Sequence, residues 1–240
     1  MTHYSRISTY ISRIVISLAL FASATTSVAQ QKPKNKIFTL EQDSIPLLRG
    51  FSVSFNLVGA AMRVFGDYGQ YEGAFKVNLH DQFFPTVEFG VGSANHDDEV
   101  TGILYKTSAP FFRIGCDVNL LRNKHGKNRL YGGIRYAFTS FNVDVSRGPM
   151  PDPVWGNTGE MSVMGEKCSQ HWAEVLFGIE TYIYGPVHLG WDVRYRRRIS
   201  HKDMSIGTAW YVPGFGTQDN DKLTANFNVL IDVWWNKKKK

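Results

Sequence analysis

Apolar and polar residues alternate along most of this chain, most clearly in the stretch 187–199. Apolar side chains fill the odd positions from Val187 to Tyr195, while the even positions from His188 to Arg198 hold a histidine, a glycine, an aspartate and three arginines. Only a β-strand places successive side chains on opposite faces. The pattern therefore predicts a strand that separates an apolar medium from a strongly polar one.

The same alternation predicts seven further strands. They cover residues 51–63, 70–79, 84–92, 111–120, 129–141, 172–183 and 223–235. The connections after the second, fourth and sixth strands are compact, whereas those after the third, fifth and seventh are long. The long connections are residues 93–110, 142–171 and 200–222. Compact turns on one side and long loops on the other are typical of outer-membrane barrels, whose long loops are extracellular.

The predicted fold is therefore all-β: an eight-stranded antiparallel up-and-down transmembrane β-barrel over residues 50–235. The alternative is a soluble periplasmic barrel whose apolar face encloses an apolar ligand, since alternation alone does not say which medium each face meets. Strand length, one-sided loops and aromatic residues on the apolar face favour the membrane. These aromatic residues include Phe51, Tyr71, Trp191 and Trp235.

The N-terminus has the pattern of a secretory signal peptide. Arg6 and Arg13 supply a basic region, residues 14–21 an apolar segment, and Ser27-Val28-Ala29 a cleavage site with small residues. We expect residues 1–29 to be removed, residues 30–49 to form a periplasmic lead-in and residues 236–240 a basic tail. The expected location is the cell outer membrane.

The charge balance narrows the possible partners. The net charge of +6 falls to +4 once Arg6 and Arg13 are removed, and the four residues Lys237–Lys240 account for that remainder. The barrel itself is neutral, so nucleic acid is not an expected partner. Cys116 and Cys168 fall in a strand and a distant loop, and we expect two unpaired thiols.

The polar face of the strands is predicted to fill the lumen with an ion network. Its expected members are Glu72, Lys76, Glu88, Arg113, Asp117, Arg135, Glu174, Glu180, Asp192, Arg194, Arg196, Arg198 and Asp232. Eight strands enclose a space just wide enough for side chains. Charges confined there must pair, because an unpaired buried charge costs several kcal/mol. We expect a structural filling, and the alternative is a narrow pore for small solutes.

The short turn at residues 184–186 predicts one register. A ladder symmetric about Gly185 places Glu174 opposite Arg196, suiting an ion pair, and Trp172 opposite Arg198, suiting a cation–π contact. The same register places Tyr182 opposite His188.

Two arginines are predicted at the outer rim of the barrel. Arg63 and Arg197 lie on the apolar face at the extracellular end of their strands, where a long cation reaches the boundary. Outer-membrane lipids and anionic lipopolysaccharide are the expected partners there. The loops 142–171 and 200–222 carry aromatic residues that either dock an extracellular ligand or protein or fold back over the barrel mouth; fold-back is favoured, since exposed apolar patches need a partner.

The exported start, the strand series from Phe51 to Trp235 and the charged lumen resemble the small OmpA/OmpX-type outer-membrane barrels. The chain is similar, more closely, to an uncharacterised family of Gram-negative outer-membrane proteins with this single-domain layout. The resemblance implies a membrane barrel and carries no catalytic motif. One departure is that Trp235 is followed by Asn236 and four lysines, whereas such barrels often end on an aromatic residue.

No enzyme, cofactor or metal is expected. Some small barrels resembling PagL or PagP modify lipids, and Ser140, His171 and Asp144 supply a nucleophile, a base and an orienting acid near one rim. Their spacing matches no family motif, so this interpretation is an alternative only. The histidines are dispersed, and the acidic segment 96–99 is interpreted as a solvated loop tip.

Overall fold

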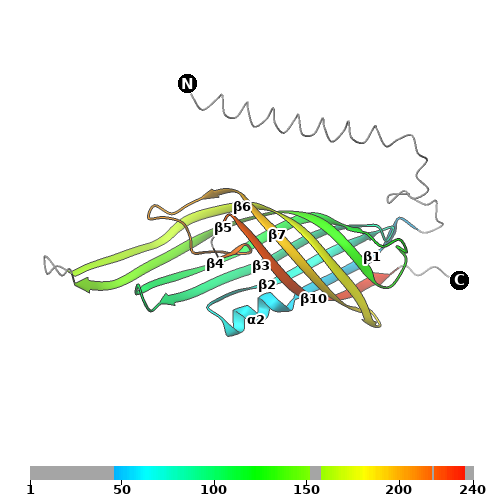
Figure 1. Ribbon diagram of the computed structural model, residues 1–240, viewed down its shortest axis with the longest axis horizontal. Coiled ribbons are helices and arrows are strands. Elements are labelled where there is room, and N and C mark those ends of the chain that lie inside the picture. Colours follow the sequence, from blue (N-terminus) through cyan, green and yellow to red (C-terminus); the bar gives the residue numbers. More distant parts are fainter. Residues whose placement is uncertain (1–45, 152–157, 218, 236–240) are drawn as a thin grey trace, which may run out of the picture. The chain divides into compact units, whose positions relative to one another are not determined.

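The computed structural model describes residues 46–151, 158–217 and 219–235 (Figure 1). The predicted signal peptide, most of the lead-in and the basic tail lie outside these residues. Among the described residues, no helix combines the length and the apolar character needed to cross a membrane.

Eight long strands pair antiparallel and close on themselves. They are β1 (Leu48–Asn56), β2 (Tyr68–Leu79), β3 (Phe83–Asp98), β4 (Ile103–Asn119), β5 (Arg129–Pro151), β6 (Thr158–Tyr184), β7 (Val187–Lys202) and β10 (Asp221–Trp235). The ring runs β1–β10–β7–β6–β5–β4–β3–β2. The predicted eight-stranded up-and-down barrel is confirmed. Two short strands, β8 (Tyr211–Val212) and β9 (Gly216–Thr217), pair within the loop between β7 and β10.

The two faces of the wall have opposite chemistry. On β7, the side chains of Trp191, Val193 and Tyr195 are exposed on the outside, whereas those of Asp192 and Arg194 are buried inside. The other strands repeat this arrangement in the part of the wall nearer the short turns, whereas at the outer ends of β4, β5 and β6 the buried face is apolar, as at Tyr105, Val143 and Cys168. A soluble barrel with an apolar core requires the reverse arrangement.

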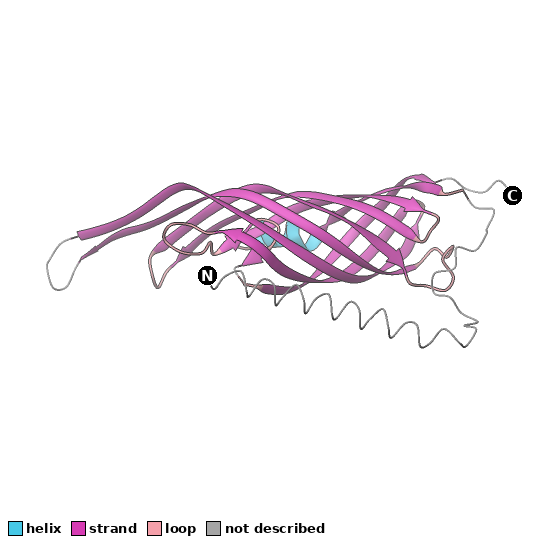
Figure 2. Cartoon of the chain, turned by 90° about the horizontal axis from the view of Figure 1, so that it is seen from above, coloured by secondary structure: helices cyan, strands magenta, loops and turns pink. Residues whose placement is uncertain are grey.

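Two of the predicted loops are in part continuations of four strands, which corrects the prediction. Residues 93–110 and 142–171 were expected to be irregular, but β3 and β4 remain paired out to Asp98 and Ile103, and β5 and β6 out to Pro151 and Thr158. The pattern failed there because the apolar side chains move to the inner face of the wall: Tyr105, Val143 and Val145 are buried inside, whereas Asn142 and Asp144 are exposed. Figures 1 and 2 show these hairpins projecting beyond the other strands.

The predicted first strand, residues 51–63, ends at Asn56 and continues as helix α2 (Leu57–Phe65). The Asn56 side chain accepts hydrogen bonds from the backbone N–H groups of Val58 and Gly59, and thereby caps the helix. Arg63 consequently lies in the last turn of α2 and not at the end of a strand, which corrects its predicted place. β1 also begins at Leu48, two residues before the predicted start of the barrel.

Helix α2 stands where β1 would otherwise complete the wall. β1 reaches only as far as the pairs Phe55–Gly73 and Asn56–Asn228. Beyond them, the ends of β2 and β10 have no β1 partner, and α2 packs against both strands. We call this region, formed by α2 with residues 68–72 and 221–227, the seam. Gly69 permits the close approach, because a Cβ there would lie 2.2 Å from the backbone nitrogen of Arg63.

We predict that Gly69→Ala destabilises the barrel by about 1–3 kcal/mol, because the added methyl group displaces α2 from the seam. The measurement is urea unfolding of the protein in detergent micelles. Gly73→Ala is the matched control on the same strand and face, since its Cβ would meet nothing closer than the Ser54 carbonyl oxygen at 3.6 Å. Equal effects of the two substitutions would show that α2 is not held at Gly69.

Candidate functional site in the barrel lumen

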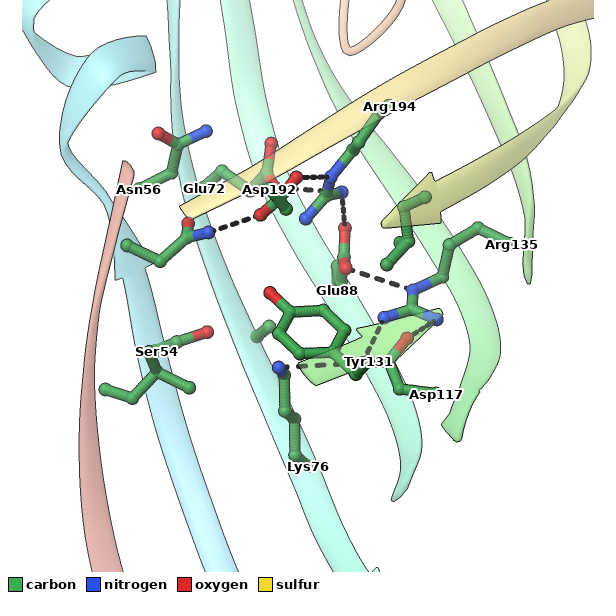
Figure 3. Close-up of a pocket in the computed structure, with 14 residues that line it drawn as sticks. Ser54, Asn56, Glu72, Lys76, Glu88, Asp117, Tyr131, Arg135, Asp192 and Arg194 are labelled. Atoms are coloured by element: carbon green, nitrogen blue, oxygen red, sulfur yellow. Dashed lines mark hydrogen bonds and ion pairs between the residues drawn. The ribbon is translucent and has the colours of Figure 1, made fainter. Parts of the chain in front are cut away.

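The buried charges of the lumen centre on Glu88, on β3. Its carboxylate lies 3.0 Å from Arg113 on β4, 3.1 Å from Arg135 on β5 and 2.6 Å from Arg194 on β7. All four side chains are almost fully buried. Figure 3 shows Arg135 and Arg194 converging on this carboxylate from opposite sides. One acid thus ties together strands from across the lumen.

A second group of contacts lies toward the outer end of the lumen. Arg113 also contacts Glu72 at 2.8 Å and Glu174 at 3.0 Å, and Glu174 lies 3.2 Å from Arg196. Glu174 stands opposite Arg196 in the ladder between β6 and β7, so the register predicted from the turn at Gly185 is confirmed.

A third group lies toward the short turns. Asp117 contacts Arg135 at 2.7 Å and Lys76 at 3.5 Å, while Glu180 lies 3.2 Å from Arg129 and 3.9 Å from Lys76. Arg129, the first residue of β5, was not among the predicted members of the network. The sequence did carry a signal for it. Arg129 lies six residues before the predicted lumen residue Arg135, and an even spacing along a strand places both side chains on the same face.

Amide side chains connect this network to the two strands that close the barrel. Asp192, which lies 2.6 Å from Arg194, accepts hydrogen bonds from Asn226 at 2.8 Å and from Asn228 at 2.6 Å. Asn226 in turn accepts one from Asn56 at 3.1 Å. The residue that caps α2 is therefore bonded to the lumen network.

The charges of this network balance. Among the described residues, six carboxylates face six cations: Glu72, Glu88, Asp117, Glu174, Glu180 and Asp192 against Lys76, Arg113, Arg129, Arg135, Arg194 and Arg196. Seven of these residues, Glu72, Lys76, Glu88, Asp117, Arg135, Asp192 and Arg194, line a cavity that retains about 10 Å³ of free space, room for about one water molecule. The lumen at this level is filled by paired side chains.

Two residues expected in the network lie outside it. Arg198 is half-buried and donates a hydrogen bond to the Asn220 side chain. It stands opposite Trp172 as predicted, but the indole N–H of Trp172 donates to Glu174 at 2.7 Å and its ring packs on Phe215. The expected cation–π contact is therefore replaced by a hydrogen bond to a carboxylate.

Asp232 lies at the end with the short turns, 3.1 Å from His188. The His188 ring contacts Tyr182 with a centroid distance of 5.6 Å, as the predicted register requires. A separate cluster at the same end was not predicted: Asp81 lies 3.1 Å from Arg49 and 2.8 Å from His125. Asp81 lies in the turn after β2 and His125 in the connection after β4, and alternation says nothing about turns, while Arg49 lies on β1 before the predicted start of the barrel.

The loop between β7 and β10, residues 203–220, folds back into the barrel mouth, and we call it the plug loop. Its residues Tyr211, Val212 and Phe215 are buried. The predicted fold-back is confirmed for this loop. For the loop 142–171 it is not tested at Trp155, which lies outside the described residues.

Lumen arginines hold the plug loop in place. Arg113 donates to the Gly214 carbonyl oxygen at 2.7 Å, and Arg196 donates to that of Phe215 at 2.8 Å. From the wall, the Tyr105 hydroxyl donates to the Tyr211 carbonyl oxygen at 2.8 Å. The same arginines thus pair with the carboxylates below and the loop backbone above.

Two of the three groups considered for chemistry have other partners. His171 Nδ1 lies 2.8 Å from the Tyr136 hydroxyl, and Asp144 accepts from the Gly165 N–H at 2.7 Å. Ser140 lies on β5, where it stands opposite Ser169 in the backbone ladder. In the described part of the chain, no cluster of three or more potential metal ligands is found.

The acidic segment 96–99 is part of the β3–β4 hairpin. His96 stacks on Trp210 of the plug loop with a centroid distance of 4.3 Å. A hydrogen bond from the Thr101 hydroxyl, with another from the Val100 N–H, holds the pKa of the Asp98 carboxyl below its usual range. These residues shape the turn and its contact with the plug loop.

We predict that Glu88→Gln destabilises the barrel by about 3–5 kcal/mol, because it leaves buried arginines without their shared carboxylate. Urea unfolding in detergent micelles measures the change. Glu160→Gln, on the exposed outer part of β6, is the control and should remain within about 0.5 kcal/mol of wild type. If both substitutions changed the free energy of unfolding equally, the ion network would not be the main determinant of stability.

Comparison with known proteins places the chain in a family. Residues 11–233 match the domain of unknown function DUF6048. No curated protein matches the sequence. Among solved structures, CarO2 of Acinetobacter baumannii is 10% identical, with coverage of 78% of this chain and 98% of that chain and a TM-score of 0.38. A major outer membrane protein from Thermus thermophilus is 15% identical, with coverage of 77% and 98% and a TM-score of 0.40. The family match spans most of the sequence, and the chain belongs to the DUF6048 family.

Proposed function

We propose that the protein is an outer-membrane barrel of the small single-domain kind that its sequence resembles, with a closed lumen and a structural or recognition role at the cell surface. The observation that carries this proposal is the arrangement of the wall. Exposed apolar side chains such as those of Phe89, Ile134 and Trp191 face outward, while charged side chains are buried inside. Such a wall is stable where its outer face meets hydrocarbon.

The filled lumen supports a role without solute passage. The balanced ion network occupies the interior, and the plug loop covers its outer end through Arg113 and Arg196. A route for solutes requires a hydrated path, and about 10 Å³ of free space does not supply one. The narrow pore is therefore the weaker alternative.

The surface role is assigned to the outer hairpins. β5 and β6 remain paired beyond the last β4–β5 pair, Ile103–Arg147. Level with that pair and below it, β6 carries exposed side chains that include Met161 and Met164. A rigid paired scaffold that raises exposed side chains above the membrane suits recognition of an extracellular ligand or protein. Arg63 and the exposed Arg197, which pairs with Asp221, lie where outer-membrane lipids and lipopolysaccharide are the proposed partners.

We predict that the protein is found in the outer-membrane fraction and migrates differently on a gel when boiled and unboiled, because a closed barrel resists detergent until it is heated. The measurement is gel mobility of outer-membrane and periplasmic fractions. Recovery in the soluble periplasm without a heat-dependent shift contradicts the proposed location.

We predict that the purified protein produces no stable conductance steps in a planar bilayer, because the ion network blocks the lumen. A variant in which residues 205–219 are replaced by a short glycine–serine turn should also remain silent, since it removes the plug loop but leaves the network below it. An open porin in the same bilayer is the positive control. Regular steps from the wild-type protein would favour the pore.

A further inference from the structure

A small pocket lies where the outer ends of β6 and β7 meet the plug loop. Its polar lining residues are Ser169 and Gln170 of β6, Arg198, His201 and Lys202 of β7, and Asp203 and Thr208 of the plug loop, and its apolar ones are Phe141, Ala209 and Val212. In the ladder, Gln170 stands opposite His201 and Ser169 opposite Lys202. The free space is about 10 Å³, enough for one water-sized atom.

The buried amide of Gln170 is the first observation that points to a ligand. The residue is 3% exposed, and its side-chain nitrogen is buried without a hydrogen-bond partner in the described part of the chain. A buried donor without a partner costs about 1–3 kcal/mol. Buried polar groups usually have a partner, which can be an ordered water molecule or an ion.

The charge around the pocket is the second observation. Arg198, His201 and Lys202 line it together with one carboxylate, that of Asp203, which lies 3.0 Å from His201. In the described part of the chain, neither Arg198 nor Lys202 forms an ion pair, in contrast to the lumen arginines. Two cations without an ion-pair partner in the described part of the chain and one buried donor therefore line the same pocket.

We propose that this pocket binds one oxyanion of the phosphate type. One anion oxygen enters the pocket and accepts a hydrogen bond from the Gln170 amide, while the remaining oxygens lie at the mouth between Arg198 and Lys202. Arginine and lysine side chains are the usual partners of phosphate groups. Thr208 places the plug loop in contact with the same ligand, so the bound anion joins the loop to the wall.

The phosphate has two possible sources, a glycolipid headgroup in the outer leaflet or a free phosphate ion. The lipid source rests on the proposed outer-membrane location, because it requires the pocket to lie at the membrane surface. Binding of the phosphate group itself does not depend on that location. Measurements on purified protein in micelles therefore test the site separately from the proposed function.

The test is a calorimetric titration: inorganic phosphate is added to the full-length protein in detergent micelles, and the heat of binding gives the dissociation constant. We expect saturable binding that Gln170→Leu and Lys202→Gln each weaken about tenfold, which is the effect of losing one charge-assisted hydrogen bond. Lys167→Gln is the matched control, since Lys167 is an exposed lysine of β6 outside the pocket. It should change the dissociation constant less than twofold. Arg198→Gln provides a further variant if Gln170→Leu fails to fold.

A second titration with micelles that contain a phosphorylated glycolipid or its dephosphorylated form separates the sources. Binding of the phosphorylated form alone supports the headgroup, and binding of inorganic phosphate without the lipid supports the free ion. The proposal is overturned if neither ligand binds saturably, which would leave the pocket to a water molecule. It is also overturned if Lys167→Gln weakens binding as much as Lys202→Gln, because the effect would then be nonspecific attraction.

Discussion

Buried charge must be neutralised within the barrel, and the rest of the structure follows from that constraint. The lumen of eight strands holds side chains and almost no water, so each carboxylate needs a cation within reach. Glu88 meets this need by contacting arginines on three strands, β4, β5 and β7. Because the partners come from different strands, the network also fixes how far each strand is displaced along its neighbours.

The plug loop depends on the same residues. Arg113 and Arg196 are oriented by Glu72 and Glu174 below them, and their remaining donors point to the backbone of the plug loop. Because these two arginines bind backbone carbonyl groups, this contact does not require particular side chains in the plug loop. Gly214, with a φ of +83° and packed against Phe111, supplies the turn that brings those carbonyl groups to the arginines.

Much of the barrel could be predicted from the sequence because its wall separates two media, and alternation records that separation directly. The turn at Gly185 further predicted the pairing of Glu174 with Arg196. Alternation of apolar and polar residues does not identify a strand where both faces are polar, as at residues 95–98. It also gives no information where the chain leaves the barrel wall. Asn56 illustrates the second case, because residues 57–63 are apolar enough to continue a strand. Whether they form a strand or a helix depends on the cap at Asn56 and on contact with Gly69, neither of which a pattern shows.

The short reach of β1 has a consequence for how the barrel closes and comes apart. The β1–β10 ladder runs only from Gly50–Trp235 to Asn56–Asn228, while the β5–β6 ladder runs from Arg129–Glu180 to Pro151–Thr158. First and last strands are joined by far fewer backbone hydrogen bonds than the strands in the middle of the chain. The β1–β2 ladder, from Leu48–Leu79 to Phe55–Gly73, is equally short. The ring is therefore mechanically uneven: a load that pulls the wall apart releases β1 from a neighbouring strand before it opens the ladders in the middle of the chain.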